Sequence, residues 1–174
     1  MGKGEIPPGL ESMDVSLKNP WTLRVTVTEK KSIGYIERRK QRVYFDAEGL
    51  VLIDGFTMIN DVPLVEGITF KNIKLYQKME CENSNIFGEI SYTTQELKKH
   101  ELVADKIVYI NDRVHVYIGK LCVSLGADVT AEKIAQIKPI IKKLGDKEGT
   151  LHLENYSEGN DTITFAIGEF PKEN

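Results

Sequence analysis

The chain has 174 residues, 41% of them hydrophobic and 28% charged, with a formal net charge of -3 at pH 7. That length accommodates one good-sized domain, or one domain with a fragment of another, and the composition is that of a globular protein with a core. The acidic balance excludes bulk attraction to nucleic acid or to an anionic membrane. No apolar run reaches the ~18 residues that indicate a membrane-spanning helix, and the N-terminus lacks the apolar region of a signal peptide.

The first 20 residues, with prolines at positions 7, 8 and 20, are predicted to be irregular. From Trp21 onward the pattern becomes extended, because Leu23, Val25 and Val27 alternate with polar residues at the period of a half-buried strand. This strand has no obvious partner upstream. Its abrupt start indicates a piece excised from a longer protein.

Three more short strands are predicted at 33–36, 43–45 and 50–53, with a turn at Asp46–Gly49, which together form a meander of antiparallel hairpins. Basic residues cluster at Lys30-Lys31 and Arg38-Arg39-Lys40. No aromatic ladder interleaves these charges, so solvated strand charges explain them better than a nucleic-acid site. Pro63–Gly67 is predicted to be a rigid turn into the next segment.

Between Asn83 and His100 the apolar spacing changes to that of a helix, with one face formed by Ile86, Phe87, Ile90 and Leu97. A second helix is predicted over 130–144. Thr130 is its N-cap, Gly145 ends it, and Pro139 removes a backbone bond or kinks it.

Extended segments flank the second helix. Strands are predicted at Lys106–Ile110, within Val114–Leu125, and from Gly149 to Leu153. A strand–helix–strand unit of this length predicts a crossover, with the helix covering one face of a sheet.

A short last strand, Thr162–Phe165, follows and has little chain after it. Such an edge offers unpaired backbone groups that a partner's extended segment can satisfy. Two alternatives stay open: the tail Gly168–Asn174 covers this strand, or the strand simply pairs within the sheet.

Residues suited to catalysis or metal binding do not form a recognisable pattern. His100, His115 and His152 are far apart in the sequence, and the latter two are predicted to be surface histidines on the solvated faces of strands. Cys81 and Cys122 fit no zinc or redox spacing, and a disulfide between them stays open. We therefore expect no cofactor and no metal.

Two further sets of residues are candidates for catalysis. Asp46, Glu48 and Asp54 flank a hairpin and are a candidate acid–base set, although turn chemistry explains them more simply. Ser124 has no neighbouring base in the sequence and is predicted to be a strand hydroxyl. An enzyme is therefore disfavoured.

Several segments, taken in order over residues 19 to 165, resemble the extracytoplasmic region of the FtsQ/DivIB family of bacterial cell-division proteins. The matching stretches are Asn19-Pro-Trp, Leu23-Arg-Val-Thr-Val-Thr-Glu-Lys, Gly34-Tyr-Ile, Tyr44-Phe-Asp-Ala-Glu-Gly-Leu-Val-Leu, Val62-Pro-Leu-Val-Glu-Gly, Val123-Ser-Leu-Gly, Glu132-Lys-Ile and Gly149-Thr-Leu-His-Leu. Each motif is weak alone, but their order and spacing are specific. The chain departs from the family pattern at Ser32, where a proline is common, and at His152, where an aspartate is usual.

The resemblance implies an α+β fold, with a curved mixed or antiparallel sheet and two main helices packed on it. It divides the chain into 1–31, an N-terminal segment with the last strand of a truncated POTRA domain, 32–167, the β domain, and 168–174, a C-terminal tail.

The resemblance also implies a non-enzymatic divisome scaffold at the division septum. The full-length protein would be anchored by one N-terminal membrane helix, with this region on the extracytoplasmic face. Its partners would be DivIC/FtsB-like and FtsL-like proteins, and the partner-binding residues carried over are Tyr156, Thr162, Ile163, Thr164 and Phe165. The rival hypotheses are a small enzyme that uses the acidic hairpin, and a POTRA-type module of an outer-membrane export system.

Overall fold

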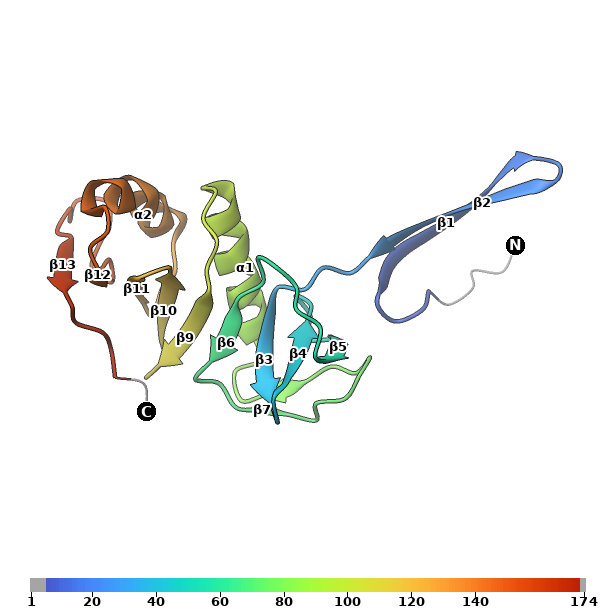
Figure 1. The fold of residues 1–174 in the computed structure, drawn as a ribbon, viewed down its shortest axis with the longest axis horizontal. Helices are drawn as coiled ribbons and strands as arrows, with labels where there is room; N and C mark the ends of the chain where they lie inside the picture. The colour runs from blue at the N-terminus through green and yellow to red at the C-terminus, as the bar shows by residue number, and fades with distance from the viewer. Residues whose placement is uncertain (1–5, 173–174) are drawn as a thin grey trace.

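The computed structural model describes residues 6–172. Within them, a two-stranded hairpin protrudes from a body in which two helices pack on one large mixed sheet (Figure 1). The predicted α+β class, with two main helices on a mixed sheet, is confirmed.

The protruding hairpin consists of β1 (Leu10–Asn19) and β2 (Thr22–Glu29), which pair antiparallel. The prediction that the first 20 residues are irregular is therefore wrong for β1. This strand does alternate apolar and polar side chains, but the prolines at positions 7, 8 and 20 indicate an irregular segment and outweigh the alternation in the prediction. In the connecting turn, the backbone N–H of Trp21 donates to Asn19 Oδ1 at 3.1 Å.

The body is built on a nine-stranded sheet with the spatial order β13-β12-β11-β10-β9-β6-β3-β4-β5. Pairing is parallel on both sides of β6 and between β11 and β12, and antiparallel between the other neighbours. A separate antiparallel pair lies in the loop before the first helix. The sheet strands are β3 (Gly34–Arg38), β4 (Gln41–Phe45), β5 (Val51–Gly55), β6 (Leu64–Glu66), β9 (Lys106–Ile110), β10 (Arg113–Ile118), β11 (Leu121–Gly126), β12 (Gly149–His152) and β13 (Thr164–Ile167), and the separate pair is β7 (Phe70–Lys71) with β8 (Glu80–Cys81).

The segment Pro63–Gly67, predicted to be a turn, contains the central strand β6 instead. Val65 is buried, and the strand lies between β3 and β9, parallel to both. Three residues are too few for a period-2 pattern to be recognised, so the flanking proline and glycine dominate the prediction.

Both predicted helices are confirmed, as α1 (Ile86–Lys99) and α2 (Ala131–Leu144). Thr130 caps α2, its hydroxyl accepting from the Lys133 backbone N–H at 3.4 Å. The helix continues through Pro139 and ends at Gly145, which has a positive φ of 63°.

The predicted crossover is also confirmed, because α2 connects β11 to the parallel strand β12. The buried Lys133 side chain stabilises the loop into α2 by donating to the carbonyls of Leu125 at 2.8 Å and Asp128 at 2.7 Å.

One continuous core lies between the helices and one face of the sheet. The inward side chains of the sheet strands pack with those of both helices in a single cluster. Since strand residues alternate between faces, the other face carries the intervening side chains. The largest fully buried apolar side chains of the core cluster include Phe45, Ile90, Leu97, Ile107, Leu125, Ile134, Ile137, Leu151 and Leu153.

A substitution at Gly67 tests how closely the backbone is packed at the end of β6. Its φ is +81°, and a Cβ placed there would lie 1.9 Å from the Tyr109 carbonyl oxygen. We expect Gly67→Ala to lower the free energy of unfolding by about 2 kcal/mol or more, through left-handed strain and the clash with backbone.

Gly88 in α1 supplies the matched control, since a Cβ there would meet no atom within 4 Å. Gly88→Ala should raise stability by up to about 1 kcal/mol through helix propensity. Chemical denaturation of both variants measures these changes. Equal effects would contradict a specific constraint at Gly67.

Candidate functional site

The edge strand β13 forms one end of the large sheet, and its only strand partner among residues 6–172 is β12. The strand spans Thr164–Ile167, so the predicted bounds, Thr162–Phe165, are wrong by two residues at each end. Thr162 still belongs to the preceding turn, because its N–H donates to Asn160 Oδ1 at 3.3 Å.

The register of β12 and β13 determines which backbone groups of the edge face outward. Thr150 is opposite Ala166, and one step beyond the strands Gly168 N donates to the Glu148 carbonyl at 2.9 Å. Hydrogen-bonded and non-hydrogen-bonded pairs alternate along an antiparallel ladder. Thr164 and Ala166 therefore bond inward to β12, and Phe165 and Ile167 direct their N–H and C=O groups outward.

The side chains of the predicted site residues fall into two groups. Tyr156, Ile163 and Phe165 are half-buried and pack against the core cluster. Thr162 and Thr164 are exposed. Tyr156 lies in the turn after β12, its N–H donating to the Leu153 carbonyl at 3.0 Å, and so it does not belong to the edge strand itself.

Sequence reasoning missed Ile167, whose side chain is 66% exposed at the C-terminal end of β13. The strand bounds excluded it, although the β-prone run continues through this residue. Ile167 therefore has both an exposed apolar side chain and outward-facing N–H and C=O groups.

The described part of the tail leaves the edge instead of pairing along it. The Thr150 hydroxyl on β12 donates to the Glu169 carbonyl at 2.6 Å. In Figure 1 the chain then passes below the sheet, on the side away from α2. Within residues 168–172 the tail forms no strand, so in the described structure the outer backbone of β13 stays open.

The opposite end of the sheet is covered at the start of β5. Val51 of β5 donates to the Gln77 carbonyl at 3.0 Å and accepts from the Tyr76 N–H at 2.9 Å. Leu50 forms an isolated bridge with Lys78. The two ends of the sheet therefore differ in their availability for strand addition.

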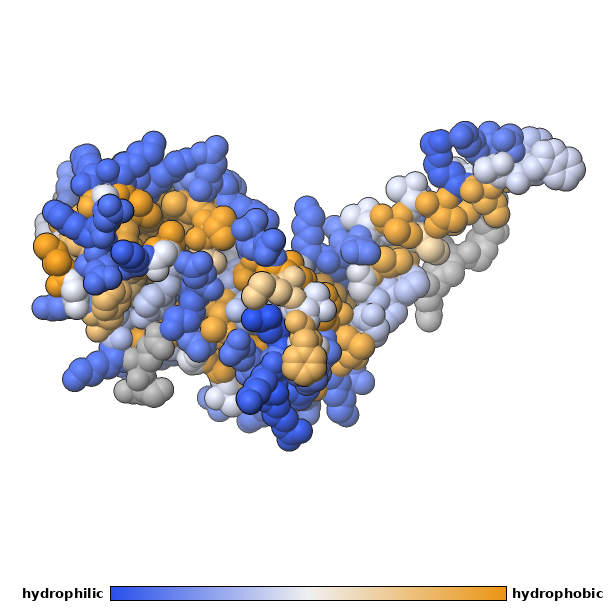
Figure 2. Space-filling model, viewed as in Figure 1, coloured by the Kyte–Doolittle hydropathy of each residue, from blue (hydrophilic) through white to orange (hydrophobic). Residues whose placement is uncertain are grey.

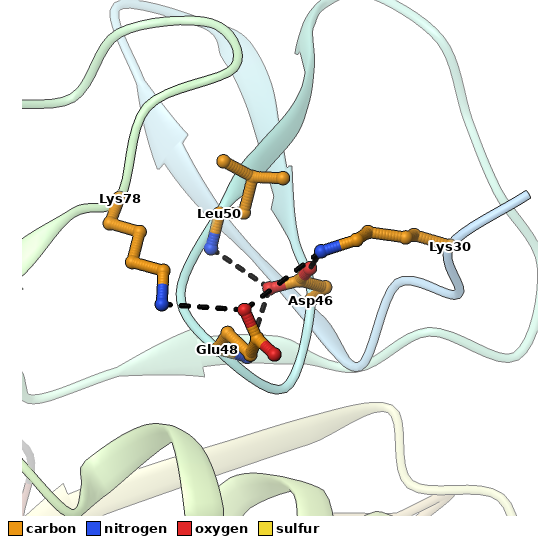
Figure 3. Close-up of polar contacts among 5 residues, drawn as sticks. All are labelled: Lys30, Asp46, Glu48, Leu50 and Lys78. Atoms are coloured by element: carbon orange, nitrogen blue, oxygen red, sulfur yellow. Dashed lines mark hydrogen bonds and ion pairs between the residues drawn. The ribbon is translucent and has the colours of Figure 1, made fainter. Parts of the chain in front are cut away.

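The acidic hairpin, the candidate for an enzyme, is a structural turn (Figure 3). Asp46 is 5% exposed, and its Oδ1 accepts the N–H groups of Glu48 and Leu50, each at 2.9 Å. Its Oδ2 pairs with Lys30 Nζ at 3.0 Å, and this hydrogen bond is the main cause of the raised pKa of Lys30. Glu48 contacts Lys78 at 3.3 Å.

The third carboxylate of the set, Asp54, lies further along β5 and pairs with Arg38 at 2.8 Å. Asp46 immediately follows β4, and Asp54 is opposite Val43 within the same hairpin. The carboxylates therefore engage separate cations and do not form a convergent acid–base pair.

Two predictions about strand side chains are wrong. His115 does not face solvent: it is 8% exposed, and its Nε2 lies 3.5 Å from Ser124 Oγ. Ser124 therefore does have a neighbouring base. Both errors have the same cause. The alternation of side chains predicted that the face of the sheet opposite the helices is solvated, whereas at β10 and β11 this face is buried. His152 is half-buried, and its Nδ1 lies 2.9 Å from Glu154 Oε1.

Cys81 is half-buried and Cys122 is buried, and no disulfide joins them. Burial raises the pKa of the Cys81 thiol. Among residues 6–172 there is no group of three or more histidine, cysteine or acidic side chains arranged to hold a metal ion. Neither described helix is long and apolar enough to cross a membrane.

A second exposed surface, missed by sequence reasoning, lies on the hairpin of β1 and β2. One of its faces is apolar at three successive cross-strand pairs, and Figure 2 shows hydrophobic side chains along the protrusion. Trp21 in the turn is 94% exposed. The exposed side chains of this apolar face are Met13, Val15, Leu17, Leu23, Val25 and Val27.

Amide hydrogen exchange tests the orientation of the β13 backbone. In the free chain we expect the N–H groups of Phe165 and Ile167 to exchange roughly tenfold or more faster than those of Thr164 and Ala166, after correction for intrinsic rates, because only the inward groups are bonded. Residue-resolved NMR measures this difference. Equal protection of all four amides would mean that another segment covers the edge.

No family model matches the chain. The chain is 24% identical over 151 residues to the cell division protein DivIB of Clostridium acetobutylicum, covering 82% of this chain and 59% of that protein. It therefore spans about three-fifths of the length of this curated relative.

A structural comparison matches the major extracytoplasmic domain, in its trans isomer, of the cell division protein DivIB from Geobacillus stearothermophilus. The match covers 67% of this chain and 95% of that one, at 22% identity and a TM-score of 0.40. The resemblance to the FtsQ/DivIB family of bacterial cell-division proteins, first indicated by the ordered motifs, is confirmed by this sequence match to DivIB.

Proposed function

We propose that the chain is a non-enzymatic scaffold of bacterial cell division that binds partner proteins by strand addition at β13. The observation that carries this proposal is the outward backbone of Phe165 and Ile167 on an uncovered edge. An extended segment of a partner would satisfy these groups, and its alternate side chains would contact Ile163, Phe165 and Ile167.

The resemblance to DivIB supplies the biological setting of the proposal. The partners would be DivIC/FtsB-like and FtsL-like division proteins at the septum. The full-length protein would be held in the cell membrane by one N-terminal helix, with the present region on the extracytoplasmic face. The separate engagement of Asp46 and Asp54 by cations supports a scaffold over an enzyme.

The hairpin of β1 and β2 supports the proposed division of the chain. Residues 1–31 would be the end of a POTRA domain, 32–167 the β domain and 168–174 the tail. An isolated two-stranded sheet is marginally stable in water, and the apolar face of this one is exposed. We propose that preceding elements of the full-length protein cover this face.

Replacing Ile167 with proline tests strand addition. The substitution removes an outward N–H that is not bonded to β12, and proline is tolerated on an edge strand in that orientation. We expect Ile167→Pro to weaken binding to a purified DivIC/FtsB-like partner about tenfold or more, through the lost hydrogen bond and the steric bulk of the ring. Isothermal titration calorimetry measures the affinity.

Ile167→Thr is the matched control, because it shortens the apolar side chain but keeps the N–H and a β-branched residue. Its affinity should stay within about threefold of the wild type. Amide spectra of both variants establish that β12 and β13 still pair. Unchanged affinity of the proline variant with this pairing intact would refute strand addition at β13.

Charge substitutions on the two faces of the hairpin test the proposed domain division. In the 174-residue chain, Val25→Asp should leave the melting temperature of the body unchanged, since Val25 is already exposed. In the full-length protein the same change should destabilise the N-terminal domain by about 2 kcal/mol or more, because it buries a charge. Calorimetry of both lengths measures this.

Thr26→Asp places the same charge on the opposite face of the hairpin, and Thr26 is also exposed. It should be nearly neutral at both lengths. If the two aspartate variants destabilise the full-length protein equally, no element covers the apolar face.

A further inference from the structure

Four polar side chains gather on the face of the sheet opposite the helices, close to the edge strand. They are His115 of β10, Ser124 of β11, His152 of β12 and Glu154 in the turn after β12. His115 Nε2 lies 3.5 Å from Ser124 Oγ, and His152 Nδ1 lies 2.9 Å from Glu154 Oε1. His115 and Ser124 are both buried. We call these residues the polar cluster.

The surroundings of His115 disfavour a positive charge on its ring. Burial is the main cause of the lowered pKa of His115, and the charges of Arg113 and His152 lower it further. The Arg113 carbonyl, 3.3 Å from Nδ1, and the charge of Glu154 act in the opposite direction. Of the flanking strands, β9 places Val108 opposite His115 and β11 places Ser124 there, so neither directly opposed side chain carries a charge.

Glu154 is the one anion of the polar cluster. Burial by itself would raise the pKa of Glu154, but its own backbone N–H, the hydrogen bond and charge of His152 and a smaller contribution of Ser124 together outweigh burial and lower it. Its Oε2 is buried and has no hydrogen-bond partner in the described residues. The carboxylate therefore stays ionised in the range where histidines titrate, and one of its oxygens is already committed to His152.

The polar cluster connects directly to β13 through the backbone. His152 is opposite Thr164, at a position where the alternation of the ladder makes a hydrogen-bonded pair. On the side of β11, the Ser124 backbone carbonyl accepts from the Leu153 N–H at 2.9 Å. A Cβ on Gly126 would lie 3.0 Å from Glu154 Cβ, so the turn that carries Glu154 packs tightly on the end of β11.

We propose that the polar cluster makes the order of β13 sensitive to pH, so that mild acid loosens β12 and β13 and weakens docking at the edge. The docking part rests on the function proposed above, whereas the effect on strand order does not.

The sign of the effect follows from the burial of the His115 ring, which disfavours its charged form and lowers its pKa. The ordinary pKa of histidine is about 6.5. Above this pH His115 is neutral in both the folded and the unfolded chain, so its titration does not change the free energy of unfolding. As the pH falls below 6.5, the unfolded chain binds a proton more readily than the folded one. Stability is therefore lost with falling pH until the folded value is reached, by up to about tenfold in the folding equilibrium per pH unit.

NMR on the 174-residue chain tests the pH effect without a partner. We expect the His115 ring to titrate below pH 6.5. Between pH 7.5 and 5.5, the protection factors of the Thr164 and Ala166 amides should fall severalfold, and more than those of amides in α1.

His115→Gln should flatten this pH dependence. His100→Gln is the matched control, since it removes a histidine at the end of α1, outside the polar cluster, and it should retain the wild-type profile. If His115→Gln does not fold, the wild-type titration still decides. A His115 ring that titrates at or above 6.5, or protection of Thr164 and Ala166 that does not change with pH, would overturn the proposal.

A binding experiment separates this proposal from the previous one. Affinity for the DivIC/FtsB-like partner is measured at pH 7.5 and at pH 5.5, with wild type and with His115→Gln. Weaker binding of the wild type at pH 5.5, restored by His115→Gln, supports the coupling to docking. If the wild type does not bind the partner at pH 7.5, docking at β13 is overturned. The amide hydrogen exchange of the chain alone then measures the pH effect by itself.

Discussion

The body holds together because the three-residue strand β6 joins two groups of strands into one sheet. Its parallel pairing with β3 on one side and β9 on the other makes one continuous apolar face, which α1 and α2 cover together. Phe87 of α1 is in ring contact with Phe45 of β4, while the rest of the same cluster reaches Leu151 of β12. Without β6 the two groups would expose two new edges and divide the core between them. The contact of Gly67 with the Tyr109 backbone belongs to the same junction.

Much of this architecture is recognisable from the sequence, for physical reasons that differ between elements. α2 has a cap at Thr130, an apolar stripe and a stop at Gly145, so local signals and tertiary packing agree. β6 was missed because it is too short to show a pattern, and β1 was missed because the prolines at positions 7, 8 and 20 indicate an irregular segment around it. The burial of His115 was missed because alternation along β10 gives the two faces of a strand but not what covers each face. That covering depends on neighbouring strands and turns far along the chain.

The candidate site, too, can be predicted from the sequence only in part. The presence of a C-terminal edge strand follows from its composition and from the short chain that remains after it. Its bounds and the outward direction of Phe165 and Ile167 depend on the register with β12, which no local pattern encodes. Similarly, the carboxylates of the acidic hairpin are visible in the sequence, but only the fold pairs Asp46 with Lys30 and Asp54 with Arg38.

The unequal ends of the sheet also limit the kind of assembly that the molecule can enter. A sheet with two open ends can pass strand pairing from copy to copy without limit, as in a fibre. Here residues 76–78 cover the start of the edge at β5, at Leu50 and Val51, whereas the edge at β13 is not covered by another strand in the described residues. Strand pairing from copy to copy through both ends of this sheet is therefore disfavoured. A second copy bound at β13 would compete with a partner protein instead of recruiting more of them.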